Sequence, residues 1–198
     1  MTPGRWARYA CGVWTSGEEP WIEIAEWDSL AVDIGGVTDG EKVCVVLGDN
    51  IIEKNIRKAV GEFFTQPSGA KLLLKEVEDP QRFGVVRFDG DRIVEFIEKP
   101  ADPPSNFAVT GLYMYDSDVF DICKTLKPSG RGELEITDVN NEYLRRGDLT
   151  YDILDGWWTD AGTFESLFRA TCLIEQGGAN NVTGVQTKTI AERAKVRT

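Results

Sequence analysis

The arrangement of apolar residues changes from strand-like to helical in the central part of the chain. Residues 43–47 form a continuous apolar run that ends at Gly48. Such a run predicts a strand buried on both faces and followed by a turn. Apolar residues between positions 51 and 63 then recur at helical spacing. A strand followed by a helix is the usual start of a layered α/β arrangement.

Further β-rich runs follow this first unit. Residues 71–77 predict a strand, and residues 83–88 and 92–98 flank an Asp-Gly turn, which predicts a hairpin. Residues 109–115 return to strand composition. The middle of the chain is therefore predicted to be mainly sheet.

The last part of the pattern predicts helices separated by a short strand. Ser117 is a candidate N-cap for an amphipathic helix, and a further helix is predicted over residues 137–146. Residues 149–154 predict a short strand and residues 156–163 a loop. Thr163 ends that loop and is predicted to cap the last helix.

This pattern predicts one mixed α/β domain, with a mostly parallel sheet flanked by helices in a Rossmann-like arrangement. We divide the chain into a divergent N-terminal region over residues 1–42, a substrate-binding domain over 43–176 and a polar tail over 177–198. A parallel-rich sheet binds ligands outside the carboxyl ends of its strands. Asp49 falls at such an end.

Charge and the absence of histidine narrow the chemistry. The 198 residues include 33 acidic and 22 basic side chains, giving a net charge of −11, so the overall field repels nucleic acid and anionic membranes. Without histidine, a Ser-His-Asp triad, a Cys-His pair and a His-bearing zinc site are excluded. Carboxylates, lysines, arginines and backbone amides remain, and they favour phosphate and Mg²⁺ chemistry.

The cysteines indicate a cytoplasmic location. Cys11, Cys44, Cys123 and Cys172 lie far apart and form no Cys-x-x-Cys pair, so we expect free thiols in a reducing compartment. No stretch has the apolar core of a signal peptide or the length of a membrane span.

Two aspartates are candidate metal ligands. Asp49 follows the first predicted strand, where its carboxylate can hold a hard cation such as Mg²⁺; the alternative is a turn residue that caps the following helix. Asp160 lies in an aromatic loop and is the best second carboxylate; the alternative is a residue of the helix entry ahead of Thr163.

Four residues are candidates for binding a sugar or a phosphate. Glu98 and Lys99 end the predicted hairpin, where a carboxylate can accept sugar hydroxyls and an ammonium can neutralise a phosphate; a solvated strand end is the alternative. Gly84 permits close approach of a ligand to the backbone, or marks a bulge. Arg131 lies in a glycine-flanked turn and suits bidentate phosphate contact, although such a residue is usually only surface.

These motifs occur in an order that resembles the sugar-1-phosphate nucleotidyltransferases, most of all those that act on glucose 1-phosphate with a thymidine nucleotide. The motifs are Leu-Gly-Asp-Asn at 47–50, Phe-Gly-Val-Val at 83–86, Glu-Lys-Pro at 98–100, Val-Thr-Gly-Leu-Tyr at 109–113, Gly-Glu-Leu-Glu-Ile-Thr-Asp at 132–138 and Trp-Thr-Asp-Ala-Gly-Thr at 158–163.

The resemblance implies a nucleotide-diphospho-sugar transferase fold and a Mg²⁺-dependent reaction. A sugar-phosphate oxygen attacks the α-phosphorus of dTTP or UTP, pyrophosphate leaves, and glucose 1-phosphate becomes a nucleotide-sugar such as dTDP-glucose. We expect these small molecules as partners, no nucleic acid or membrane, and a homo-oligomer.

The resemblance also assigns roles to single residues. Asp49 and Asp160 match the two Mg²⁺-binding aspartates. Lys99 matches the lysine on the sugar phosphate, and Arg131 matches an arginine that approaches the phosphates. These two cations are therefore the candidate catalytic residues.

Further positions match the sugar-binding part of the family's site. Gly84 and Glu98 match sugar contacts, and Thr110 with Gly111 matches the strand that borders the sugar pocket. Together with Lys99 they are expected to hold the sugar phosphate.

The chain departs from the family pattern before residue 43. The family opens with a glycine-rich loop followed by Thr-Arg-Leu and later by a Pro-Lys segment, which cradle the triphosphate and supply further cations. Here Gly35 and Gly36 are followed by Val-Thr-Asp, so we expect an N-terminally incomplete version of the fold. In enzymes generally, losing one such donor lowers the rate by about 10²–10³.

Three functions therefore stay open. The first is nucleotidyl transfer from dTTP to glucose 1-phosphate. The second is a non-catalytic remnant that binds a sugar phosphate or a nucleotide-sugar. The third is a metal-dependent glycosyltransferase, which the motifs at 98–100 and 158–163 disfavour.

Overall fold

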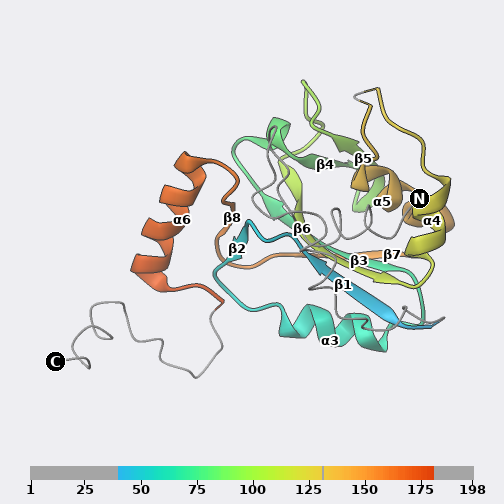
Figure 1. Cartoon of the computed structure of the whole chain (residues 1–198), viewed down its shortest axis with the longest axis horizontal. Helices are drawn as coiled ribbons and strands as arrows, with labels where there is room; N and C mark the ends of the chain where they lie inside the picture. Colours follow the sequence, from blue (N-terminus) through green and yellow to red (C-terminus); the bar gives the residue numbers. More distant parts are fainter. Residues whose placement is uncertain (1–39, 131, 181–198) are drawn as a thin grey trace, which may run out of the picture.

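The computed structural model describes residues 40–130 and 132–180. A six-stranded sheet forms the body of this part (Figure 1). Its strands are β1 (Lys42–Val46), β3 (Ala70–Glu76), β4 (Gly84–Asp89), β5 (Arg92–Glu98), β6 (Phe107–Asp116) and β7 (Leu149–Ile153). The predicted strands and the hairpin of β4 and β5 are thus confirmed.

The sheet is mostly antiparallel in the described residues, which corrects the prediction of a mostly parallel one. Its order is β5-β4-β6-β3-β7, with β1 beside β6. Strand β6 runs antiparallel to β1, β3 and β4, whereas β7 runs parallel to β3. Parallel neighbours need a long crossover, usually a helix. Between β3 and β6 the chain forms only the 3-10 turn η1 and the hairpin of β4 and β5, without an α-helix, and β3 and β6 pair as antiparallel neighbours.

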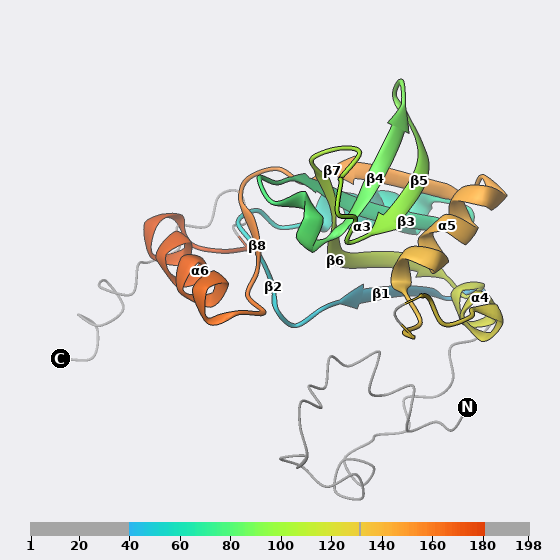
Figure 2. The ribbon, with the colours of Figure 1, turned by 90° about the horizontal axis from the view of Figure 1, so that it is seen from above.

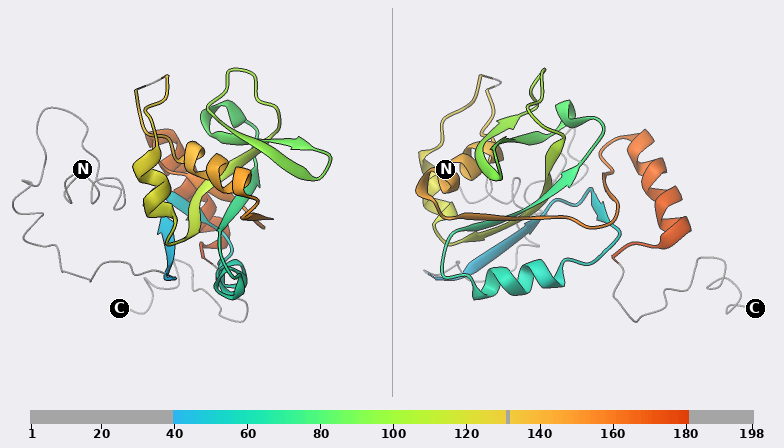
Figure 3. Two further views of the ribbon diagram at one scale, coloured as in Figure 1. Left: turned by 90° about the vertical axis from the view of Figure 1, so that its right-hand side faces the viewer. Right: turned by 180° about the vertical axis from the view of Figure 1, so that it is seen from behind.

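Helices cover both faces of the sheet, so the mixed α/β class is confirmed (Figure 3). The helical elements are α3 (Arg57–Thr65), the 3-10 turn η1 (Pro80–Arg82), α4 (Val119–Thr125), α5 (Ile136–Arg146) and α6 (Phe164–Gly177). Within the described residues, no helix combines the length and the apolar composition needed to cross a membrane.

Successive side chains of the central strands point to opposite faces of the sheet and pack into two apolar cores. Leu72 of β3 packs with the α4 and α5 side, where Tyr115, Ile122 and Tyr143 are buried. The intervening Leu73 packs on the other face with Phe63 of α3. The continuous apolar run of β3 therefore reflects burial on both faces of the sheet.

Strand β1 is more exposed than its apolar sequence predicts. Val46 is 55% exposed, and Cys44 is exposed as well. Among the described strands β1 pairs only with β6, so its other edge is left open. The described cysteines Cys44, Cys123 and Cys172 are free thiols, as expected, whereas Cys11 lies outside the described residues.

A second, two-stranded sheet lies between the main sheet and α6 (Figures 1 and 2). Strand β2 (Asn50–Ile52) pairs with β8 (Trp158–Asp160), so residues 51–52 are in a strand and not in the predicted helix, which begins only at Arg57. Likewise, the predicted loop over residues 156–163 contains β8. Three-residue strands are too short to show a period-two pattern.

Helix α6 starts at a reciprocal cap. The Thr163 hydroxyl accepts the Ser166 backbone N–H at 3.1 Å, and the Thr163 backbone N–H donates to the Ser166 hydroxyl at 3.0 Å. Thr163 is therefore an N-cap as predicted. Ser117 is not a cap, because α4 begins after Asp118 and the Ser117 hydroxyl accepts from the Gly40 backbone.

Replacing Thr163 with alanine should lower the free energy of unfolding by about 1 kcal/mol, because the Ser166 backbone N–H loses its acceptor and the Ser166 hydroxyl loses a partner. Urea denaturation followed by circular dichroism measures this change. The matched control is Thr171→Ala on the same helix, where an exposed hydroxyl donates only to the Leu167 carbonyl. Its change should stay within about 0.5 kcal/mol. Equal changes in the two variants would contradict the role of the cap.

Candidate functional site

The pairing of β2 with β8 brings the two candidate metal ligands together. Asp49 directly precedes β2, and Asp160 is the β8 partner of Asn50 in the ladder. The Ala161 N–H donates to the Asp49 carbonyl at 2.7 Å. The Asp160 Oδ1 accepts the Gly162 N–H at 2.8 Å, which turns this carboxylate back towards Asp49. Both side chains are partly buried.

The electrostatics show that these two carboxylates interact. The pKa of Asp160 is raised above its usual value, chiefly because burial removes water from the charged form. The Gly162 N–H opposes this shift, and the negative charge of Asp49 adds to it. Arg82 lies close enough to lower the same pKa. A cation between the two carboxylates would relieve their repulsion.

Gly84 and Glu98 face each other across the β4–β5 ladder. The Glu98 Oε2 lies 3.1 Å from the position that a Cβ on Gly84 would take, so a side chain there would crowd the carboxylate. The Thr137 hydroxyl donates to the same oxygen at 2.5 Å. Glu98 is thus held by β4 on one side and by the start of α5 on the other.

Lys99 follows Glu98 in a left-handed backbone conformation, with φ of 41°. Its backbone N–H donates to the Phe83 carbonyl at 3.0 Å, and its Nζ lies 3.9 Å from the Glu98 Oε1. The side chain is half exposed, so the ammonium remains accessible. A residue other than glycine rarely adopts this conformation, and such strain concentrates at functional sites.

Thr110 and Gly111 lie on β6 and form one wall of the candidate site. The Thr110 side chain is fully buried and donates to the Leu73 carbonyl at 2.9 Å. The Gly111 N–H donates to the Asn50 Oδ1, and its carbonyl accepts the Leu47 N–H at 2.8 Å. These bonds within the protein favour a role in shaping the pocket over direct hydrogen bonding to a ligand.

Tyr113 links the two halves of the site. It is 7% exposed, and burial followed by the negative charges of Glu98, Asp49 and Asp160 raises the pKa of its hydroxyl. All three carboxylates therefore lie near enough to act electrostatically on this hydroxyl. Tyr113 stands in one of the sequence motifs, but its type alone does not distinguish a core tyrosine from one that reaches a site.

Two further site residues are missed by the sequence reasoning. Asn50 hydrogen-bonds to Asp49, and Thr137 to Glu98. Their positions beside Asp49 and at a predicted helix start are the signals available. Arg131, by contrast, lies outside the described residues, so the structure does not place it relative to the other candidates.

Arg82 is a described cation near the carboxylates. Its guanidinium forms an ion pair with Asp79 at 2.8 Å and lies 5.4 Å from the centre of the Phe83 ring. The Phe83 ring in turn meets the edge of Trp158, with centroids 5.2 Å apart. These contacts lead from the start of β4 to β8.

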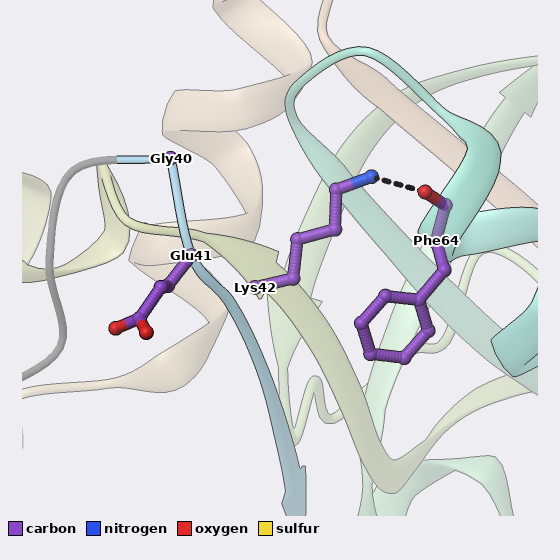
Figure 4. A pocket seen from close by; sticks show the side chains of 4 residues that line it. All are labelled: Gly40, Glu41, Lys42 and Phe64. Atoms are coloured by element: carbon purple, nitrogen blue, oxygen red, sulfur yellow. Dashed lines mark hydrogen bonds between the residues drawn. The ribbon is translucent and has the colours of Figure 1, made fainter.

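An open hollow of about 580 Å³ lies elsewhere, between the start of β1 and the end of α3 (Figure 4). It is lined by Gly40, Glu41, Lys42 and Phe64. The Lys42 Nζ donates to the carbonyls of Phe63 at 2.7 Å, Phe64 at 3.1 Å and Gln66. An ammonium has three donors, so the carbonyls at the end of α3 accept all the hydrogen bonds that Lys42 can donate.

The donor set at Asp49 and Asp160 fits Mg²⁺. Magnesium prefers oxygen ligands and is usually held by one or two carboxylates together with water and substrate phosphates. Within the described ranges, no group of three or more Cys, Asp or Glu side chains is placed to hold a metal by itself. Two aspartates therefore suit a cation that is shared with a phosphorylated substrate.

Comparison with known proteins agrees with this geometry. Residues 27–177 match the family described as Nucleotidyl transferase. A glucose-1-phosphate thymidylyltransferase of Neisseria meningitidis is 45% identical over 139 residues, which are 68% of this chain and 48% of that protein. One from Xanthomonas campestris is 44% identical over 69% of this chain and 48% of its own length. The chain thus spans about half the length of these curated relatives.

Solved structures resemble the same part of the chain. A Bacillus anthracis protein described as a glucose-1-phosphate thymidylyltransferase, in complex with a sucrose, is 57% identical with a TM-score of 0.64, over 68% of this chain and 55% of that one. A UDP-glucose pyrophosphorylase complexed with UDP-glucose is 26% identical with a TM-score of 0.61, over 69% and 57%. The nucleotide-diphospho-sugar transferase fold is thereby confirmed. The chain belongs to the nucleotidyl transferase family.

Proposed function

We propose that this chain takes part in nucleotidyl transfer from dTTP to glucose 1-phosphate, giving dTDP-glucose and pyrophosphate with Mg²⁺ as cofactor. The observation that carries the proposal is the convergence of Asp49 and Asp160 beside Glu98 and Lys99 in a chain of this family. Thymidine is favoured over uridine because the curated relatives named above are thymidylyltransferases.

In the proposed reaction, an oxygen of the sugar phosphate bonds to the α-phosphorus of the triphosphate. The bond from that phosphorus to the bridging oxygen breaks, and pyrophosphate leaves with the electron pair. Such transfer requires mainly positioning and charge neutralisation. Mg²⁺ held by Asp49 and Asp160 would supply part of that neutralisation.

The remaining residues of the site would bind and orient the sugar phosphate. Glu98, fixed by Thr137, can accept hydrogen bonds from sugar hydroxyls, and Gly84 leaves room beside it. The accessible Lys99 ammonium can hold the phosphate. Tyr113 stays protonated and can donate to a sugar oxygen. We assign phosphate contact to Arg131 from its place in the motif alone.

We further propose that residues 43–176 form the substrate-binding unit, between the divergent region 1–42 and the polar tail 177–198. The homo-oligomer and the cytoplasmic location stay predictions from the sequence.

A second candidate function is binding of a nucleotide-sugar without turnover. It is favoured by one observation, namely that Gly35 and Gly36 are not followed by the basic signature of a triphosphate-binding loop. Both candidates use the same carboxylates and the same lysine. Turnover, and not ligand binding, therefore separates them.

Pyrophosphate release from dTTP and glucose 1-phosphate with Mg²⁺ tests the first candidate, with calorimetric titration of dTDP-glucose in parallel. We expect release above the level of a Lys99→Ala variant, because the lysine neutralises the attacking phosphate. Binding without release would favour the second candidate. Neither binding nor release would contradict both.

The Lys99→Ala variant should bind glucose 1-phosphate about 10–100-fold more weakly, since a hydrogen bond to a charged group contributes about 1.5–3 kcal/mol. Its affinity for free dTTP should change little. Lys54→Ala is the matched control, because Lys54 is equally exposed and pairs with Asp155 at 3.8 Å. If affinity for both ligands falls equally in Lys99→Ala, the residue is misassigned.

The Asp160→Asn variant should lose Mg²⁺-dependent binding of dTDP-glucose while its unfolding midpoint stays almost unchanged. Removing one of two repelling carboxylates does not weaken the fold, but it removes an anionic ligand that Mg²⁺ requires. Isothermal titration with and without Mg²⁺ measures the first effect, and thermal unfolding the second. Asp155→Asn serves as control, because that side chain is 87% exposed. An unchanged Mg²⁺ dependence in Asp160→Asn would remove this residue from the metal site.

A further inference from the structure

The side-chain amide of Asn50 joins three parts of the site. Its Oδ1 accepts the Gly111 N–H of β6 at 2.8 Å and the Trp158 indole N–H of β8 at 2.7 Å. Its Nδ2 donates to the Asp49 Oδ1 at 2.9 Å. One partly buried amide therefore connects the main sheet, the small sheet and a candidate metal ligand.

The orientation of this amide is determined by chemistry. A backbone N–H and an indole N–H can only donate, so the oxygen of Asn50 must face Gly111 and Trp158. The amide nitrogen then points to Asp49, whose carboxylate oxygen accepts its hydrogen bond. A reversed amide would set donors against donors and leave an oxygen against a carboxylate.

The backbone of β6 leaves room for this amide. A Cβ on Gly111 would overlap the Asn50 side chain, with its Cγ at 2.8 Å and its Oδ1 at 2.9 Å. Gly111 is not among the described glycines that have a positive φ. Its backbone conformation is therefore not the reason why a glycine is needed at this position. The reason is the close approach of the Asn50 side chain to the strand.

The bond from Asn50 also determines which oxygen of Asp49 faces Asp160. Oδ1 is held by the amide, and Oδ2 lies on the side of the Asp160–Gly162 turn, 3.5 Å from the Cβ position of Gly162. The Asp160 Oδ1 lies 2.8 Å from that same position. The two oxygens therefore approach the same turn.

We propose that Asn50 is a positioning residue, which holds the Asp49 carboxylate towards Asp160 so that the two aspartates would hold one divalent cation together. This inference rests on the proposed function, because it takes the two aspartates as metal ligands. Hydrogen bonds of this kind orient metal ligands, and removing one typically lowers metal affinity or activity by about 10–100-fold.

Mn²⁺ binding tests the proposal without turnover. Free Mn²⁺ is measured by electron paramagnetic resonance during titration of the full chain, once without a ligand and once with dTDP-glucose at a fixed concentration, and the same dTDP-glucose without protein is the blank. We expect Asn50→Ala to bind Mn²⁺ about 10–100-fold more weakly than the natural chain, with Asp49→Asn and Asp160→Asn binding weakest.

The structural control is Asn141→Ala. The Asn141 amide accepts from the Phe96 N–H and donates to the Phe96 carbonyl, both at 2.8 Å, and so joins α5 to β5. Its loss should lower the unfolding midpoint but leave Mn²⁺ affinity within about twofold. If Asn50→Ala does not fold, Trp158→Phe decides instead, because it removes only one donor to Asn50 and keeps a ring. We expect that variant to bind Mn²⁺ about threefold more weakly, below the range of about 10–100-fold for losing the contact to the ligand itself, because Asn50 and its bond to Asp49 remain.

The outcomes separate the two proposals. If the natural chain binds Mn²⁺ and both aspartate variants lose it, while Asn50→Ala and Trp158→Phe bind like the natural chain, the positioning role is overturned and the metal pair stands. If the natural chain binds no more Mn²⁺ than Asp49→Asn even with dTDP-glucose present, the metal pair is overturned, and the role of Asn50 with it.

Discussion

The pairing of two three-residue strands is the constraint on which the candidate site depends. Asp49 directly precedes strand β2, and Asp160 is the last residue of β8 and pairs with Asn50, so the antiparallel register alone makes the two aspartates neighbours. A ribbon of this length is not stable by itself in water. It is held by backbone bonds from Leu47 to Gly111 and from Glu53 to Trp157, and by the Asn50 amide. The position of both carboxylates therefore depends on the position of β6.

Strand β6 can transmit that position because it is the most enclosed element of the sheet. Its ten residues pair with three strands, and seven of them are buried. Tyr113 and Tyr115 stack on one face, while Leu112 and Met114 pack on the other. A close-packed strand does not shift without moving both cores. The wall of the site is therefore rigid, as positioning of reacting groups requires.

Hydrophobic pattern predicts most of the fold because long strands and helices carry a clear period. It fails for β2 and β8, where three residues show none, and for strand direction, which depends on how the connections run. It also overstates the burial of β1, because an apolar run does not reveal that a strand lies at an open edge.

In the candidate site too, features that depend on neighbouring residues can be predicted from the sequence, whereas features that depend on residues far apart in the sequence cannot. Asp49, Glu98 and Asp160 can be selected from the sequence, since each carboxylate ends a strand or stands in a motif. Asn50 cannot be selected in this way, because its partners Gly111 and Trp158 are 61 and 108 residues away. A residue that positions another is defined by such partners, whereas a ligand residue is recognised by its own chemistry.

The negative charges near Tyr113 determine the order in which ligands can bind to the site. Glu98, Asp49 and Asp160 all act on its hydroxyl, and burial raises the pKa of Asp160 and so makes its charged form less favourable than in water. Among the described cations near them, Lys99 faces Glu98 and Arg82 is already paired with Asp79. A phosphate approaching Asp49 and Asp160 alone would therefore meet net repulsion. A divalent cation gains from both carboxylates and then presents positive charge to a phosphate, so the proposed chemistry requires cation binding before or together with the nucleotide.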